Sequence, residues 1–396
     1  MDRVREVFER GLAKQPAGGA AFAATVDGEQ VISLWGGEAS PGTRWSETTP
    51  ALTMSVTKGW AAMCAMVLAD RGLLDVDAPV SRYWPEFAAN GKEGITVRHV
   101  LLHQGGLVGL PRSSEIVGWD GRGWSDYDAI TGSLASATPS WEPGTAYGYH
   151  AVTYGWLMLE LVRRIDGRTL GAFFHDEIAT PLGIQSAVGI DGSRVTDVAR
   201  VSQPAVPLVA RPIYKRFSAA MNDPGTLLGQ AFLADGTHSI ADNPSLLDTN
   251  EFFAAEIPSS NGVSSASDLA RLYAPLANGG ALDGHRLVNE PTLLSWSTHV
   301  LTAEDLMMTS SLTFFGSGLL TRRMQTHRTL GFHINHPDPK KQLFGPSPTA
   351  FGSEGMGGQV AFADPDRHVS VAFVRSSLGN SPRFVRDLTA ALYAAL

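Results

Sequence analysis

The sequence has few of the features that mark exported, membrane-bound or nucleic-acid-binding proteins. A single cysteine, Cys64, excludes a disulfide within the chain, and its place in an apolar run predicts a buried packing role. No apolar run is long enough to span a bilayer, and the first ten residues alternate in charge instead of forming the apolar core of a signal peptide. A net charge of −8 argues against nucleic-acid partners and anionic membrane surfaces. These absences predict a cytoplasmic globular protein and leave its oligomeric state open.

A stretch beginning at Ser55 combines a serine and a lysine in a spacing suited to nucleophilic catalysis. Lys58 follows Ser55 by three residues, and the strongly apolar residues 60–69 predict a helix. Residues at this spacing share a helix face, so the Lys58 amine is expected to reach the Ser55 hydroxyl. Near a helix N-terminus, free N–H groups favour the negative charge that develops there. Apolar surroundings lower the pKa of a lysine, so a neutral Lys58 can activate Ser55 for covalent acyl transfer.

The same pair also has a structural explanation, in which Ser55 caps a helix and Lys58 lies at the surface. Two observations favour catalysis. No other serine in this lysine-poor chain stands three residues before a lysine. The helix behind the pair is also too apolar for a surface helix.

Strand patterns lie at both ends of the chain, and helical patterns lie between them. Residues 19–26 and 30–35 flank Asp27-Gly28, which predicts a tight β-hairpin. Further strands are predicted at residues 316–320, 329–335, 359–363 and 369–375, before a closing helix at 382–396. Helices are predicted at residues 97–103, 151–165 and 266–277.

This order of elements predicts an α+β fold. One antiparallel sheet, flanked by N- and C-terminal helices, is expected to form an α/β domain from residues 1–74 and 288–396. A mostly helical domain, residues 75–287, would be inserted into it. Residues 201–258 are long, proline-rich and weakly patterned, so we expect them to cover a binding cleft as a wall or lid.

A second candidate stretch, residues 141–150, contains a Pro-Gly turn directly before a predicted helix. A tyrosine held there, Tyr147 or Tyr149, can shuttle a proton once nearby cations lower its pKa. Amphipathic packing is the other explanation for both tyrosines. His150 has three candidate roles: tuning the tyrosine, lining the leaving-group side of the site, or packing beneath it.

Taken in order, Ser55-Val56-Thr57-Lys58, Pro143-Gly144-Thr145 followed by Tyr149, and a late glycine-rich strand resemble the serine β-lactamase superfamily. Within it, the chain resembles the class C β-lactamase-related esterases, also called family VIII carboxylesterases, and it is also similar to lovastatin-type acyltransferases. The resemblance implies a β-lactamase/penicillin-binding-protein-like fold and places the catalytic tyrosine on Tyr149. Ala151 stands where class C β-lactamases carry an asparagine, which points to the esterase branch.

The third motif lies within residues 351–358. Where the family usually has Lys or His, a variable residue and Gly, this chain has Ser353, Glu354 and Gly355. The resemblance implies that the N–H groups of Ser55 and Met356 form the oxyanion hole. Because Ser353 replaces a basic residue and Glu354 is acidic, a neutral or cationic ester is expected. A β-bulge or turn at a sheet edge would also explain the glycines.

Other candidate chemistry is set aside. His327, His333 and His336 lie close in sequence, but the pattern lacks good ligand geometry and accompanying carboxylates, so no metal and no other cofactor is predicted. No G-x-S-x-G motif supports a Ser-His-Asp triad. Four tryptophans are candidates for an apolar acyl pocket or for core packing: Trp84, Trp119, Trp124 and Trp141. Trp141, which begins the stretch 141–150, is expected to contact the substrate.

The sequence therefore predicts a serine hydrolase, a carboxylesterase that acts on a small neutral ester through acyl-Ser55 with Lys58 and Tyr149. Its partner would be a small-molecule ester or acyl donor. The alternatives are an acyltransferase that passes the acyl group to an alcohol or amine of a secondary metabolite, and a β-lactamase or D-Ala-D-Ala peptidase. A non-catalytic binding protein on the same fold is the alternative from another class.

Overall fold

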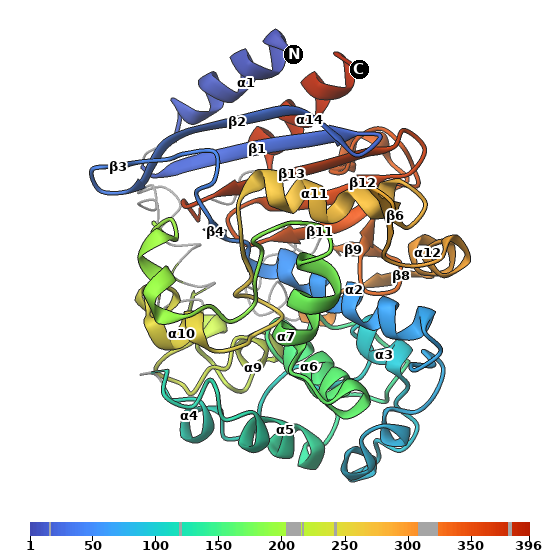
Figure 1. Cartoon of the computed structure of the whole chain (residues 1–396). Helices are drawn as coiled ribbons and strands as arrows, with labels where there is room; N and C mark the ends of the chain where they lie inside the picture. The colour runs from blue at the N-terminus through green and yellow to red at the C-terminus, as the bar shows by residue number, and fades with distance from the viewer. Residues whose placement is uncertain are drawn as a thin grey trace.

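The computed structural model describes residues 1–15, 17–118, 121–202, 215, 218–240, 244–307, 324–378 and 382–396. Within them, an antiparallel sheet has the strand order β3-β2-β1-β13-β12-β11-β10-β9-β8. Its strands are β1 Gly19–Val26, β2 Glu29–Ser40, β3 Thr43–Arg44, β8 Leu301–Glu304, β9 Gln325–Arg328, β10 His333–Ile334, β11 Phe351–Gly355, β12 Gln359–Asp364 and β13 Val369–Arg375. The first and last strands of the chain, β1 and β13, are neighbours, so both ends of the chain build one sheet (Figure 1).

The hairpin between β1 and β2 forms at the predicted turn, where Asp27 and Gly28 have φ angles of 51° and 85°. β12 and β13 lie where the sequence predicted strands. The predicted strand at 329–335 is wrong over its first part, because Thr329 N bonds to Phe332 O in a turn through Gly331 at φ 83°. Only His333–Ile334 of that range is a strand. The predicted strand at 316–320 lies outside the described residues.

Side chains alternate between the two faces of the sheet. On β13, Val371 and Phe373 pack with the terminal helices α1 (Asp2–Leu12) and α14 (Arg383–Tyr393). Ala372 and Val374 face the opposite core, where α11 (Ala266–Ala277) lies against β1, β12 and β13. The sequence placed α11 in the helical domain, but its apolar stripe packs on the sheet (Figure 1). The rest of the predicted domain division stays a prediction.

Helices fill the space below the sheet in Figure 1. They are α2 Thr57–Asp70, α3 Val97–Leu101, α4 Ser113–Ile116, α5 Tyr127–Ser136, α6 Thr153–Asp166, α7 Leu170–Phe174, α9 Leu227–Ala231 and α10 Asn250–Ala254. A further helix, α12 (Glu290–Ser297), lies beside β8 and β9. Short helical elements also occur: η1 Met54–Val56, η2 Val80–Arg82, η3 Pro85–Ala88, η4 His175–Ala179, η5 Gly192–Asp197, η8 Pro244–Asp248 and η9 Pro339–Lys341. Two further strand pairs are β4 (Ala51–Leu52) with β5 (Val263–Ser264), and β6 (Ala281–Leu282) with β7 (His285–Arg286). No helix of the described ranges is long and apolar enough to cross a bilayer.

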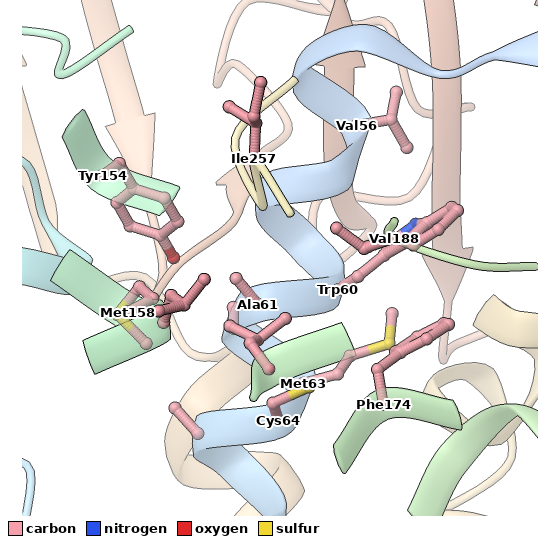
Figure 2. Packing of buried hydrophobic residues seen from close by; sticks show 14 of the residues in the cluster. Val56, Trp60, Ala61, Met63, Cys64, Tyr154, Met158, Phe174, Val188 and Ile257 are labelled. Atoms are coloured by element: carbon pink, nitrogen blue, oxygen red, sulfur yellow. The ribbon is translucent and has the colours of Figure 1, made fainter. Parts of the chain in front are cut away.

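The helix that follows Ser55 is the centre of the core. Every residue of α2 from Thr57 to Leu68 is buried, as expected for a helix that is apolar on all sides. Trp60 stacks on Phe174 with ring centroids 5.0 Å apart, and Cys64 is buried among these side chains (Figure 2). This packing holds the helix against β11.

The proposed lid segment is described only in part. Of residues 201–258, positions 203–214, 216–217 and 241–243 lie outside the described residues. Ser113 Oγ bonds to Leu233 O at 3.5 Å, and Phe252 packs edge-on against Trp124. These contacts join the described part to the helical region, and a covering role over the cleft stays a prediction.

Candidate active site

A turn before α2 positions Ser55. Thr53 Oγ1 donates to Gly262 O at 2.9 Å, and Gly262 N donates to Thr57 Oγ1 at 2.9 Å. Met54, between them, has a left-handed φ of 52°, a conformation that costs free energy in a non-glycine residue. These bonds from the strand pair β4–β5 hold the turn and leave the Ser55 side chain half-buried at the start of α2.

Lys58 lies one helical turn after Ser55 and is almost fully buried. Its Nζ lies 3.2 Å from Ser55 Oγ, 2.7 Å from Ala151 O and 2.8 Å from Ser259 O. A neutral amine has two N–H bonds and one lone pair. When the two carbonyl oxygens accept the N–H bonds, the lone pair is left for the Ser55 hydroxyl.

Burial favours that neutral form. Desolvation, followed by the nearby positive charge of Arg328, lowers the pKa of Lys58 well below its ordinary value. No carboxylate forms an ion pair with Lys58 in the described part of the chain. The structure therefore gives Lys58 the properties of a base.

Tyr149 lies on the other side of Ser55. The Lys58 amine is 4.8 Å from the centre of its ring, and Asp305 Oδ1 accepts from its backbone N at 3.3 Å. Burial raises the pKa of Tyr149 to about 12, although the hydrogen bond with the Ser55 side chain and the charge of Arg328 act to lower it. Tyr149 is therefore a neutral phenol at neutral pH and can donate a proton.

Tyr147 does not share this position. It is buried, and its ring meets His103 edge-on with centroids 5.7 Å apart. Its backbone O accepts from Leu306 N at 3.0 Å, which ties the loop to the end of β8. The structure thus brings Tyr149, and not Tyr147, to the serine and lysine.

The third motif runs along β11 against the turn of Ser55. A Cβ atom on Gly355 would lie 3.1 Å from Ser55 N and 2.7 Å from Thr53 O, so only glycine allows this approach. Met356 follows directly and is partly buried against the core. Ser55 N thus lies close to Gly355, the residue before Met356. The role of the Ser55 and Met356 N–H groups as an oxyanion hole stays a proposal.

Ser353 is buried beneath the strand, and its expected substrate contact stays a prediction. It is 3% exposed, and a Cβ on Gly59 would lie 2.7 Å from its Oγ and 2.3 Å from the hydroxyl of Tyr273. Ser353 therefore faces α2 and α11 beneath the strand. Glu354, the next residue, points the other way and reaches solvent. Desolvation by the surrounding protein still raises the pKa of the Glu354 carboxyl.

His150 is also buried, which agrees with the packing role among its three candidate roles, and a substrate contact stays a prediction. Nε2 accepts from Leu107 N at 3.0 Å, and Nδ1 lies 2.6 Å from Gly148 O. Both nitrogens of the neutral ring are therefore used by the backbone, and burial lowers the pKa of His150 to about 4. His150 fixes the loop of Tyr149 from below.

The tryptophans divide between core and site. Trp84 and Trp124 are core residues with 2% and 0% exposure, and Trp119 lies outside the described residues. Trp141 is half-buried and packs on Gly148 and edge-on against His150, at a centroid distance of 6.0 Å. It supports the tyrosine loop, and a substrate contact stays a prediction.

Three features of the site were missed by sequence reasoning. The carbonyls of Ala151 and Ser259 come from segments whose sequences carry no sign of contact with a lysine. Arg328 is a buried arginine at the end of β9, and its only signal in the sequence was a cation two residues before the apolar Leu330-Gly331-Phe332 run. Asp305, which binds the backbone of Tyr149, had no signal.

Two other regions lie apart from this cluster. His327 and His336 meet edge-on at 4.7 Å, but no three His, Cys, Asp or Glu side chains of the described ranges converge as metal ligands. A cavity of about 350 Å³ lies between residues 106–114 and the segment 224–235. Neither region contains Ser55, Lys58 or Tyr149.

The geometry can be compared with known proteins. The model of the Beta-lactamase family matches residues 4–396. The chain belongs to the β-lactamase family. The esterase/beta-lactamase LipL of Mycobacterium tuberculosis is 32% identical over 382 residues, which cover 91% of this chain and 77% of that relative.

Two solved structures of the family match the whole chain. A penicillin-binding protein homologue from Caulobacter crescentus is 34% identical with a TM-score of 0.82, and a family VIII carboxylesterase is 31% identical with a TM-score of 0.81. Each match covers 100% of this chain and 97% of the other. The resemblance and the β-lactamase/penicillin-binding-protein-like fold predicted from the motifs are confirmed. The chain is an enzyme of this superfamily with esterases among its relatives.

Proposed function

We propose that the protein is a carboxylesterase that hydrolyses small esters through an acyl-Ser55 intermediate. The observation that carries this proposal is the position of the Lys58 amine, 3.2 Å from Ser55 Oγ, with two backbone carbonyls to accept its N–H bonds. A serine hydroxyl needs an adjacent base to become a nucleophile, and a buried neutral amine is such a base. The esterase relatives support the same class of reaction.

Acylation begins when Lys58 takes the proton of Ser55 Oγ as this oxygen attacks the ester carbonyl carbon. The negative charge then lies on the carbonyl oxygen, which the N–H groups of Ser55 and Met356 would stabilise. The bond to the alcohol oxygen breaks as Tyr149 donates its phenolic proton to that oxygen. Protonated Lys58 returns a proton to Tyr149 and is neutral again.

Deacylation follows the reverse order. Lys58 takes a proton from a water molecule whose oxygen attacks the acyl carbon. The bond between the acyl carbon and Ser55 Oγ then breaks, and protonated Lys58 gives its proton to Ser55 Oγ and is neutral again. The carboxylic acid is the product. An alcohol or amine in place of water would give acyl transfer by the same steps, so transferase activity is the second candidate on the same intermediate.

The test uses p-nitrophenyl butyrate, a small neutral ester, with the wild type and Ser55→Ala. We expect wild-type protein to release p-nitrophenol and Ser55→Ala to release none above the uncatalysed rate. Intact-mass spectrometry of rapidly quenched wild type should show a butyryl adduct that Ser55→Ala lacks. Wild-type turnover in Ser55→Ala would overturn the proposal, and no turnover by the wild type on any ester would favour a binding protein.

A competing alcohol separates hydrolysis from transfer. With the alcohol present, a hydrolase releases butyric acid and a transferase releases the butyrate ester of the alcohol. A β-lactam chromophore in the same assay tests the lactamase alternative. The cytoplasmic location expected from composition stays a prediction.

A further inference from the structure

Asn261 is a buried residue in the loop that follows α10, and it is 1% exposed. Its Nδ2 donates to Phe252 O at 2.6 Å and to Ala255 O at 2.7 Å. Its Oδ1 accepts from Ile257 N at 3.0 Å. Both N–H bonds of the amide, and its carbonyl oxygen, are therefore used by the backbone of the preceding segment. These three bonds tie the loop 257–262 to the end of α10.

The same loop contacts both Ser55 and Lys58 or their immediate supports. Two residues before Asn261, Ser259 O accepts from Lys58 Nζ at 2.8 Å. One residue after Asn261, the N and O atoms of Gly262 bond to the turn that carries Ser55. Asn261 therefore lies between a partner of the base and a partner of the turn that positions the nucleophile.

Ser259 is closely packed on both sides. A Cβ atom on Gly155 of α6 would lie 2.5 Å from Ser259 N, so only glycine allows this contact. Ser260 N and Asn261 N both donate to Ile257 O, at 2.8 and 3.2 Å, and close a tight turn around Ser259. The Ser259 carbonyl thus lies between α6 and this turn, and its direction depends on the conformation of the turn.

The direction of the Ser259 carbonyl affects where the lone pair of Lys58 points. A neutral amine has two N–H bonds and one lone pair. When Ser259 O and Ala151 O accept the two N–H bonds, the lone pair is left for Ser55 Oγ. If Ser259 O turned away, Ser55 Oγ would become the acceptor for an N–H bond. The hydroxyl would then lose the lone pair that takes its proton.

We propose that Asn261 is a positioning residue for Ser55 and Lys58, because its amide holds the Ser259 carbonyl in the direction that leaves the Lys58 lone pair for Ser55. The proposal rests on the proposed function only in the role of Lys58 as the base. Loss of the amide bonds should slow the activation of Ser55 without removing the base. A misplacement of about 1 Å can lower a reaction rate by about 10²-fold.

The experiment measures how fast Ser55 reacts with an alkyl fluorophosphonate in the wild type, Asn261→Leu and a control. In this reaction Ser55 Oγ bonds to phosphorus and displaces fluoride while Lys58 takes the hydroxyl proton. Intact-mass spectrometry gives the rate of labelling and the final labelled fraction. We expect Asn261→Leu to be labelled completely, with a rate constant about 10 to 10²-fold below that of the wild type. The kcat for p-nitrophenyl butyrate should fall by a similar factor while KM changes little.

The matched control is Asn335→Leu, which removes a second buried amide with the same kinds of partner. Asn335 Nδ2 donates to Gly345 O at 2.9 Å and to Ser347 O at 2.8 Å, and its Oδ1 accepts from Phe344 N at 3.1 Å. Phe344 packs with the terminal helices, on the face of the sheet opposite α11. We expect Asn335→Leu to lose stability, as Asn261→Leu does, and to keep the wild-type rate of labelling.

Thermal unfolding shows whether each variant is folded, and Asn261→Ser is the second variant if Asn261→Leu is not. Labelling of the folded variant at the wild-type rate would overturn the proposal, whether the labelled fraction is complete or reduced. A reduced fraction at that rate would mean that the amide only stabilises the fold. Equal slowing in Asn335→Leu would also overturn it. A wild type that is labelled but hydrolyses no ester would reject the carboxylesterase, and the labelling rates would still test Asn261.

Discussion

The Lys58 amine bonds to two backbone carbonyls, and these uncharged partners allow it to act as a base. A carboxylate beside a buried lysine would favour the ammonium ion, which has no lone pair for a proton. Carbonyl oxygens satisfy the N–H bonds without adding a negative charge. The contact between Lys58 and Ser55 follows from three-residue spacing on a helix, so it could be predicted from the sequence. The carbonyls of Ala151 and Ser259 lie 93 and 201 residues away and could not.

At this scale, the two loop tyrosines give a paired prediction. Tyr149→Phe removes the proton donor next to Ser55 and should lower kcat by about 10² to 10⁴-fold. Tyr147→Phe removes a hydroxyl buried beside His103 and should change kcat by no more than a few-fold. Steady-state kinetics with p-nitrophenyl butyrate measures both, and equal effects would show that the structure assigns the wrong tyrosine.

At the scale of elements, the site depends on how closely β11 approaches the turn of Ser55. Two glycines allow that approach. Gly59 leaves room on α2 for the hydroxyls of Tyr273 and Ser353, and Gly355 leaves room on β11 for Thr53 and Ser55. The third motif drew attention to Gly355 in the sequence, whereas no motif drew attention to Gly59. The direction of the Ser353 side chain could not be predicted, because strand alternation depends on a register that only the sheet pairing defines.

Gly355→Ala tests this approach. The new Cβ would lie 2.7 Å from Thr53 O, a backbone atom, so the strand must move away from Ser55. Loss of one oxyanion donor typically costs about 10² to 10³-fold in kcat, and a displaced donor should cost at least about tenfold. The control is Gly132→Ala on α5, where the new Cβ meets nothing within 4 Å. It should keep full activity and be slightly more stable, because alanine favours helix over glycine. Unchanged kcat in folded Gly355→Ala would contradict this role of β11.

At the scale of the whole molecule, the helical core contains buried histidines whose rings are neutral in the folded protein. His103 and His150 are 0% and 1% exposed, and His150 N donates to His103 Nδ1 at 3.2 Å. Burial lowers the pKa of both rings, that of His150 to about 4. Below about pH 6.5 the unfolded chain binds protons at these positions and the folded chain does not, so stability falls as pH falls.

The expected result is a lower free energy of unfolding at pH 5 than at pH 7, by about 2 kcal/mol from His150 and by a further amount from His103. Urea unfolding followed by fluorescence at the two pH values measures the loss. His150→Gln should be less stable at pH 7 but should lose about 2 kcal/mol less on acidification. His175→Gln, which changes an exposed histidine, should behave as the wild type. If His150→Gln loses as much as the wild type, carboxylates and not buried histidines cause the acid sensitivity.

Local patterns in the sequence were enough to predict the hairpin at Asp27-Gly28, the apolar helix after Ser55, the Ser55–Lys58 contact and the family. The first three depend on residues within a few positions of one another, where helix and turn geometry determine which residues can touch. The family follows from three separate motifs taken in order. Only the tertiary structure decided that α11 packs on the sheet, that Ser353 and His150 face inward, and that Arg328 is buried. Those outcomes depend on strand register and on contacts between distant segments, which follow from the packing of the whole chain.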